Sequence, residues 1–241
     1  MPQLRKISFN GTIVPYLFRC PRSLYLRAVK KLYPPREEAD PLVSTPRQLG
    51  IDMHDALRAY FTGEKELVSP LVMTDLLDEL YDTAHTPDVT VYVEHEFLFD
   101  EFMNPIETAP KEGPFIYMRP DLVLVSDDQI RVFDWKGGNP DYGATQYHLE
   151  TEFFLAGMAA LYPDIGLAET IIYFPYKDYV LPTRTFNRTE MGSRQTYFTN
   201  LIDRILKDNL CWPTPSRMRC SFCDYRSEEA GGMHECEDTA V

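Results

Sequence analysis

The stretch IRVFDWK, residues 130–136, decides how this chain is interpreted. Its first four residues are β-branched, aromatic or long side chains that suit a strand, and its last three combine an acid, an aromatic residue and a lysine. Successive side chains of a strand point to opposite faces, so Asp134 and Lys136 are expected on one face and Trp135 on the other.

A second strand-like run, RPDLVLV at residues 119–125, lies just upstream and carries Asp121. Two carboxylates on adjacent strands can hold a hard divalent cation, which prefers oxygen ligands. A lysine beside that cation can orient a water molecule and stabilise the charge that develops on a phosphate. Asp121, Asp134 and Lys136 therefore predict chemistry suited to hydrolysing a phosphodiester.

The composition is that of a folded chain outside the membrane. The 241 residues fit one large domain or two small ones, and the apolar content of 44% suffices for a core. No apolar run approaches the roughly 20 residues that span a bilayer. The first six residues lead into no apolar secretion segment. We expect a cytoplasmic protein without a membrane partner.

Charge is unevenly distributed around a net value of −13, which argues against a generic nucleic-acid coat. Residues 1–36 hold eight basic and no acidic residues, and residues 181–219 hold seven basic and three acidic ones. Residues 37–180 hold 8 basic against 28 acidic residues. If the two basic segments meet in space they can form a phosphate-binding surface. The alternative is that they are solvated helix faces.

Five cysteines, an odd number in a chain without a secretion signal, argue against a disulfide framework. Cys220 and Cys223 have the spacing of metal ligands, and Cys236 is close enough to join them. A fourth ligand would come from Cys20 or Cys211. This spacing does not distinguish zinc from an iron–sulfur cluster.

Hydrophobic periodicity predicts a mixed sheet flanked by helices in one domain. Glu94, inside one of the expected strands, is interpreted as solvated or as a neighbour of metal ligands rather than as a ligand. The expected helices are 48–61, 74–81, 145–161 and 191–209, and the expected strands are 89–99, 115–125, 129–136 and 169–174.

Several short motifs, taken in their order along the chain, resemble those of the RecB-like nucleases of the PD-(D/E)xK superfamily, specifically the iron–sulfur subgroup. That subgroup includes the CRISPR-associated RecB-like exonucleases and the nuclease domain of AddB. The similarity runs nearly end to end. The matching segments are Cys20-Pro21 followed by Leu24-Tyr25-Leu26, Gly50-x3-His54, Asp121, Asp134-x-Lys136, Gln146, and Pro213-x-Pro215 followed by Cys220-x2-Cys223 and Cys236.

The resemblance implies an α/β fold in which the PD-(D/E)xK core has a mixed central sheet flanked by helices. Residues 1–241 would form a single RecB-like nuclease domain. Within it, residues 1–36 and 181–241 would form the part that bears the cluster, so that an iron–sulfur cluster joins the N- and C-terminal segments.

The resemblance also implies a role for each matching residue. Lys136 would position the nucleophilic water, and Gln146 would contact DNA or support the lysine. Mn²⁺ or Mg²⁺ would be bound by His54, Asp121, Asp134 and the backbone carbonyl of Trp135. A [4Fe–4S] cluster would be bound by Cys20, Cys220, Cys223 and Cys236.

The sequence departs from the family pattern at several positions. Glu150 stands four residues after Gln146, where a tyrosine is common, and Gly137 follows the lysine where threonine is frequent. The twelve residues between Cys223 and Cys236 exceed the usual spacing, which allows Cys211 to compete as a ligand.

The function expected from these features is that of a metal-dependent deoxyribonuclease, an exonuclease acting on single-stranded DNA ends. The alternative is a catalytically silent DNA-binding or assembly module whose iron–sulfur or zinc site is structural. No phosphate loop of the G-x4-GK[ST] kind is present, so unwinding would require a helicase or a recombination or adaptation protein as partner.

Overall fold

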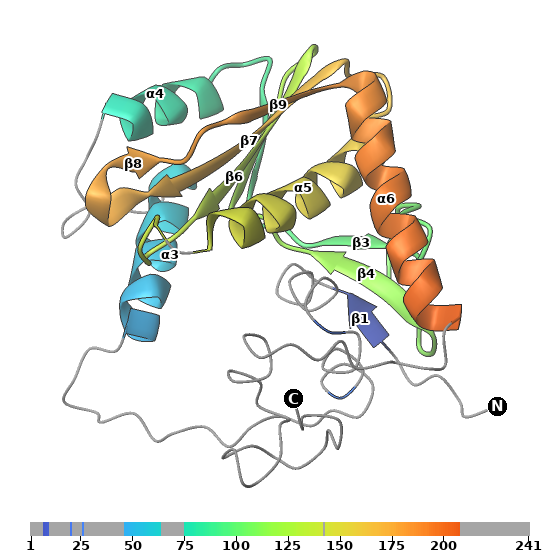
Figure 1. The fold of residues 1–241 in the computed structure, drawn as a ribbon. Helices are drawn as coiled ribbons and strands as arrows, with labels where there is room; N and C mark the ends of the chain where they lie inside the picture. Colours follow the sequence, from blue (N-terminus) through green and yellow to red (C-terminus); the bar gives the residue numbers. More distant parts are fainter. Residues whose placement is uncertain are drawn as a thin grey trace, which may run out of the picture. The chain divides into compact units, whose positions relative to one another are not determined.

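A computed structural model describes residues 7–9, 20, 26, 46–63, 75–141 and 143–207 (Figure 1). The chain divides into two compact units. The first comprises Met1–Glu38, Leu98–Tyr117 and Tyr197–Val241, and the second comprises Ala39–Phe97 and Met118–Thr196. The prediction that residues 1–241 form a single nuclease domain stays a prediction.

The second unit is built on a mixed sheet with the strand order β2-β5-β6-β7-β8, in which β9 also pairs with β7. Only β6 and β7 run parallel, and α5 (Ala144–Leu161) forms the crossover between them. The strands are β2 (Thr90–Val93), β5 (Leu122–Val125), β6 (Gln129–Trp135), β7 (Leu167–Phe174), β8 (Tyr179–Val180) and β9 (Arg184–Asn187).

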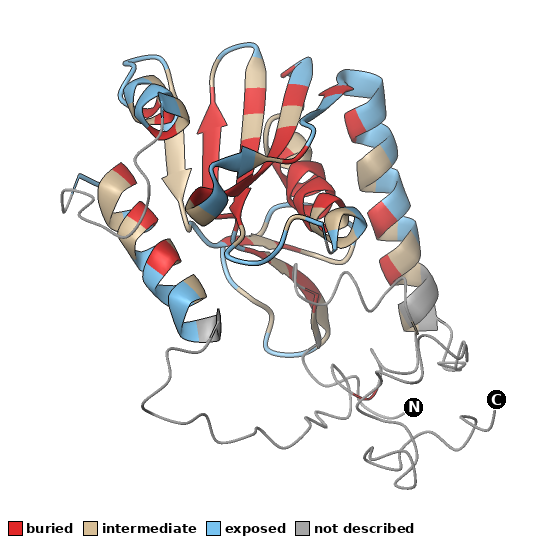
Figure 2. Ribbon diagram, turned by 60° about the vertical axis from the view of Figure 1, so that its left-hand side comes forward, coloured by how far each residue is buried: buried red, intermediate tan, exposed pale blue. Residues whose placement is uncertain are grey.

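Helices cover both faces of this sheet. On one face α3 (Pro46–Phe61) and α4 (Asp75–Ala84) pack against alternate residues of the central strands. The Trp135 ring stacks on Phe61 there, with ring centroids 6.1 Å apart. On the other face the apolar residues of β7 meet α5, which is buried along much of its length (Figure 2). The predicted mixed sheet flanked by helices is therefore confirmed.

The first unit contains a smaller sheet with the order β1-β4-β3, in which β1 runs parallel to β4. Its strands are β1 (Ile7–Phe9), β3 (Phe97–Phe99) and β4 (Pro114–Met118). A 3₁₀ turn, η2 (Pro175–Lys177), follows β7, and α6 (Arg188–Lys207) begins in the second unit and ends in the first.

Two expected strands are each split in two, so the prediction that each is continuous was wrong. Residues 89–99 form β2 and β3, because the backbone turns at Glu94, whose φ is 44°. Residues 115–125 form β4 and β5, separated by residues 119–121. Pro120 has no N–H to donate to a ladder, which favours a break there. The other expected helices and strands are present, with bounds shifted by up to three residues.

Among the residues that the structure describes, no helix combines the length and apolar character needed to cross a membrane. Of the predicted cluster ligands, Cys20 is half-buried. Cys220, Cys223, Cys236 and the competing Cys211 lie outside the described residues.

Candidate metal centre and active site

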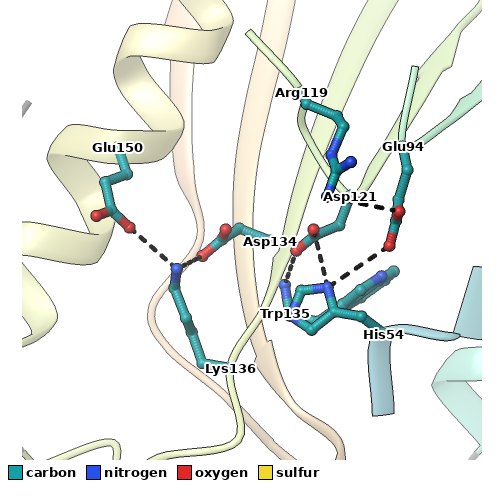
Figure 3. A network of polar contacts seen from close by, with 8 residues as sticks. All are labelled: His54, Glu94, Arg119, Asp121, Asp134, Trp135, Lys136 and Glu150. Atoms are coloured by element: carbon teal, nitrogen blue, oxygen red, sulfur yellow. Dashed lines mark hydrogen bonds and ion pairs between the residues drawn. The ribbon is translucent and has the colours of Figure 1, made fainter. Parts of the chain in front are cut away.

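Asp134 and Lys136 lie on the same face at the end of β6, as strand alternation predicted. The Lys136 N–H donates to the Tyr173 carbonyl at 2.9 Å, which continues the parallel pairing beyond the last residue of β6. The Lys136 Nζ lies 2.8 Å from Asp134 Oδ2 and forms an ion pair with it (Figure 3). Trp135 points to the opposite face and packs in the core with α3.

Asp121 lies beside this pair because β5 and β6 are antiparallel neighbours. The residue after it, Leu122, is paired with Phe133, the residue before Asp134. The backbone N–H of Trp135 donates to Asp121 Oδ2 at 2.6 Å, so one carboxylate oxygen is held by the neighbouring strand. The other oxygen, Oδ1, points toward His54.

His54 projects from α3 toward two carboxylates. Its Nδ1 lies 3.1 Å from Asp121 Oδ1 and 3.8 Å from Glu94 Oε1 (Figure 3). One ligand atom from each of the three residues lies within 4.8 Å of the others. An imidazole nitrogen with two carboxylate oxygens is a donor set that suits Mn²⁺ or Mg²⁺. The residues present therefore fit a divalent cation.

Glu94 is the residue that sequence reasoning placed least well. Its side chain is only 14% exposed, so the solvated interpretation is wrong. It follows the end of β2 in a left-handed backbone conformation, and its N–H donates to the Asp121 carbonyl at 2.9 Å. A non-glycine residue held at positive φ is strained, and such strain is concentrated at functional sites. Arg119, 3.9 Å from Glu94 Oε2, adds a positive charge.

Charges around the site alter its proton affinities. Burial lowers the pKa of His54, but the Asp121, Asp134 and Glu94 carboxylates outweigh this effect and raise the pKa above its ordinary value. Burial raises the pKa of the Asp134 carboxyl to about 7, even though Lys136 lowers it. Both shifts favour proton uptake by a crowded group of carboxylates, and a bound divalent ion would offset the same negative charge.

A second carboxylate holds the lysine. The Lys136 ammonium donates to Glu150 Oε2 on α5 at 3.0 Å and lies 5.0 Å from the centre of the Tyr147 ring. Burial lowers the pKa of Lys136, but Asp134 and Glu150 more than compensate and raise it. Gln146, one helical turn before Glu150, is half-buried on the same helix. Sequence reasoning noted Glu150 only as a departure, although its spacing from Gln146 would have placed both on one side of α5.

Comparison with known proteins agrees with this geometry. The family model described as the PD-(D/E)XK nuclease superfamily matches residues 14–227. The chain belongs to the PD-(D/E)XK nuclease superfamily, whose members are generally metal-dependent nucleases.

Among solved structures, "Crystal structure of SSO0001" is 15% identical, covering 97% of this chain and 87% of that one with a TM-score of 0.47. An identity and a TM-score this low support no inference about function. A search of curated proteins finds no match.

Proposed function

We propose that this protein is a metal-dependent DNA nuclease that hydrolyses phosphodiester bonds. The observation that carries the proposal is the convergence of His54, Glu94 and Asp121 beside the Asp134–Lys136 pair, in a chain of the PD-(D/E)XK superfamily. Binding alone would not require a half-buried lysine held between two carboxylates at the edge of a cation site.

The cation would be Mn²⁺ or Mg²⁺, held by His54, Glu94 and Asp121, with Asp134 and the Trp135 carbonyl as further ligands. When bound, it would supply Lewis-acid activation of water and neutralise charge on the phosphate. The Trp135 N–H that holds Asp121 Oδ2 leaves Oδ1 oriented toward His54, so Asp121 is already positioned for this role.

Lys136 acts as a fixed cation in this proposal. Its raised pKa keeps the ammonium protonated at neutral pH, so it donates hydrogen bonds and does not accept a proton. Positioned beside Asp134, it orients the attacking water and stabilises the charge that develops on the phosphate. Gln146, which lies one turn before Glu150 on the same side of α5, contacts the DNA strand or supports the lysine.

For the substrate, we propose single-stranded DNA ends and exonuclease action. The resemblance to the RecB-like iron–sulfur subgroup supports this, and the site residues that it implies, His54, Asp121, Asp134 and Lys136, come together. Duplex unwinding is assigned to a helicase or to a recombination or adaptation partner.

We also propose a [4Fe–4S] cluster bound by Cys20, Cys220, Cys223 and Cys236. An anaerobically purified sample should be brown and contain iron and sulfide, and a serine at any of these positions should bleach it. A colourless anaerobic preparation that contains zinc would remove the iron assignment. If Cys211→Ser bleaches the protein and Cys236→Ser does not, Cys211 is a cluster ligand in place of Cys236.

The proposed activity is tested with end-labelled single- and double-stranded DNA in Mn²⁺ or Mg²⁺. Wild-type protein should degrade single strands, and chelator should abolish cleavage. Lys136→Ala should lower kcat about 10²- to 10³-fold, as expected when a group that stabilises developing charge is removed. Lys177→Ala is the matched control, because Lys177 is an exposed lysine just after β7. Cleavage by folded Lys136→Ala at the wild-type rate would refute the assignment.

A further inference from the structure

The basic segment that begins at residue 181 contributes a fixed pair of arginines. Arg184 on β9 and Arg194 on α6 both bind the Glu152 carboxylate of α5, Arg194 through its Nε at 3.2 Å. Figure 1 labels these three elements, β9, α5 and α6. Glu152 is 1% exposed, whereas Arg184 and Arg194 are 44% and 39% exposed. The two guanidinium groups therefore share one buried anchor while their remaining donors reach solvent.

The local environment fixes this pair further. Arg194 lies over the buried Phe186 ring, with its guanidinium carbon 5.8 Å from the ring centroid. The nearby Glu190 carboxylate is engaged at the start of α6, where it accepts the Asn187 N–H at 2.8 Å. Two arginines and one carboxylate leave a net positive charge at this position in a protein of net charge −13.

Two buried polar atoms adjoin the pair. His148 lies one turn before Glu152 on α5, and Thr170 is the register partner of Arg184 on β7. Within the described part of the chain, His148 Nδ1 and Thr170 Oγ1 are buried without a hydrogen-bond partner. Such atoms are few in folded proteins, and their burial keeps them from contacting a ligand directly. Arg184 and Arg194 are the members of this group with substantial exposure, and their guanidinium donors suit an anion.

The arginine pair and the active site lie on opposite flanks of one helix. Glu150 and Glu152 are two residues apart on α5, which separates their directions by about 200°. Thr170 and Ile172, the register partners of Arg184 and Asp134, are two residues apart on β7, so both sites open on the same sheet face. From the register, they are roughly 10 Å apart across the strands.

We infer that Arg184 and Arg194, held by Glu152, bind the phosphodiester backbone of the DNA strand away from the bond being cut. The planar guanidinium fork matches phosphate oxygens, and a fork that is already fixed loses little entropy on binding. This inference rests on the proposed function for the identity of the ligand. It adds a second contact for the DNA strand, separate from the metal centre.

The first test is binding of a fluorescent oligothymidylate in chelator across a range of salt concentrations. Arg184→Ala and Arg194→Ala should each weaken binding on the order of tenfold and reduce the slope of log K against log salt by about 0.7 per lost contact. Arg188→Ala is the matched control, because Arg188 is 64% exposed and its ion pair with Asp164 is 3.8 Å long. Equal effects in Arg188→Ala and the two test variants would overturn the inference.

Removing both arginines in Arg184→Ala/Arg194→Ala would leave Glu152 as a buried unpaired charge and destabilise the fold. The triple variant Glu152→Gln/Arg184→Ala/Arg194→Ala therefore removes all three charges together. It should lose both phosphate contacts with an intact fold. A lowered melting temperature with unchanged DNA affinity and salt slope would show a purely structural ion pair and overturn the inference.

A second readout separates this inference from the proposed function. With bis(p-nitrophenyl) phosphate, a phosphodiester too small to reach the arginine pair, kcat/KM should be unchanged in the arginine variants, whereas KM for long oligonucleotides should rise. If wild-type protein binds DNA through these arginines but cleaves nothing, the proposed function fails and the inference stands. If it cleaves DNA and the variants keep the wild-type KM, the inference fails and the function stands.

Discussion

The Glu150 carboxylate accepts a hydrogen bond from the Lys136 ammonium at 3.0 Å, and so the lysine is held from the helix as well as from its own strand. A strand end alone leaves a long lysine side chain several rotamers. The second contact selects one of them, in which Nζ lies 2.8 Å from Asp134 Oδ2.

Loss of this contact should therefore slow chemistry more than it affects binding. Glu150→Ala is expected to lower kcat for DNA cleavage on the order of tenfold with little change in KM, and Glu150→Gln, which keeps an acceptor oxygen, should be partly restored. Steady-state kinetics with saturating Mn²⁺ measure this. Glu169→Gln, which removes a partly buried carboxylate on β7 that is paired with Arg131, is the control. Equal kcat in Glu150→Ala and wild type would remove Glu150 from the account.

Glu94 should contribute directly to cation affinity. Replacing it with glutamine removes a charged oxygen next to His54 and Asp121, so Mn²⁺ binding should weaken by about 10- to 100-fold, with activity partly recovered at high Mn²⁺. Isothermal titration calorimetry gives the affinities, with the exposed Glu107→Gln as the matched control. Unchanged affinity in Glu94→Gln would mean that Glu94 does not touch the ion.

Cation binding should depend on pH through His54. The neighbouring carboxylates raise the pKa of its imidazolium, and only the neutral imidazole can bind a metal. Affinity for Mn²⁺ should level off only where both His54 and Asp134 have lost their protons, and it should fall at least about tenfold per pH unit below the His54 pKa, because each bound ion must then displace a proton. Titrations at several pH values measure the slope. An affinity that does not fall in acid would contradict ligation by His54.

The placement of His54 depends on how α3 packs. Leu57 is buried one turn after Met53 on this helix. Leu57→Ala should therefore lower the free energy of unfolding by about 2–5 kcal/mol. Leu49→Ala on the same helix removes an exposed side chain and should change stability by less than about 0.5 kcal/mol. Urea denaturation separates the two, and equal losses would place α3 differently from the structure.

The sequence predicted the parts of the site that follow from local geometry. Alternation along a strand put Asp134 and Lys136 together, and short pairing with the preceding strand brought in Asp121. His54 was predicted only through the glycine–histidine spacing of the family, because helical periodicity does not say which strand end a helix meets.

Other features depend on conformation or on distant pairing and were not predictable in this way. Glu94 reaches the site only because its backbone adopts a left-handed conformation, which no glycine or asparagine signals. The Arg184–Glu152 pair joins residues 32 positions apart in sequence, and periodicity carries no information about that contact. Because α5 is buried over most of its length, its polar residues did not stand out as a separate face.

In the proposed active site, His54, Glu94 and Asp121 share one divalent cation. Anomalous diffraction from crystals soaked in Mn²⁺ tests it most directly. We expect a single strong manganese peak bounded by His54 Nδ1, a Glu94 carboxylate oxygen and Asp121 Oδ1, and its disappearance in Asp121→Asn. A Mn²⁺-dependent nuclease whose manganese lies elsewhere, with these three side chains unligated, would contradict the account.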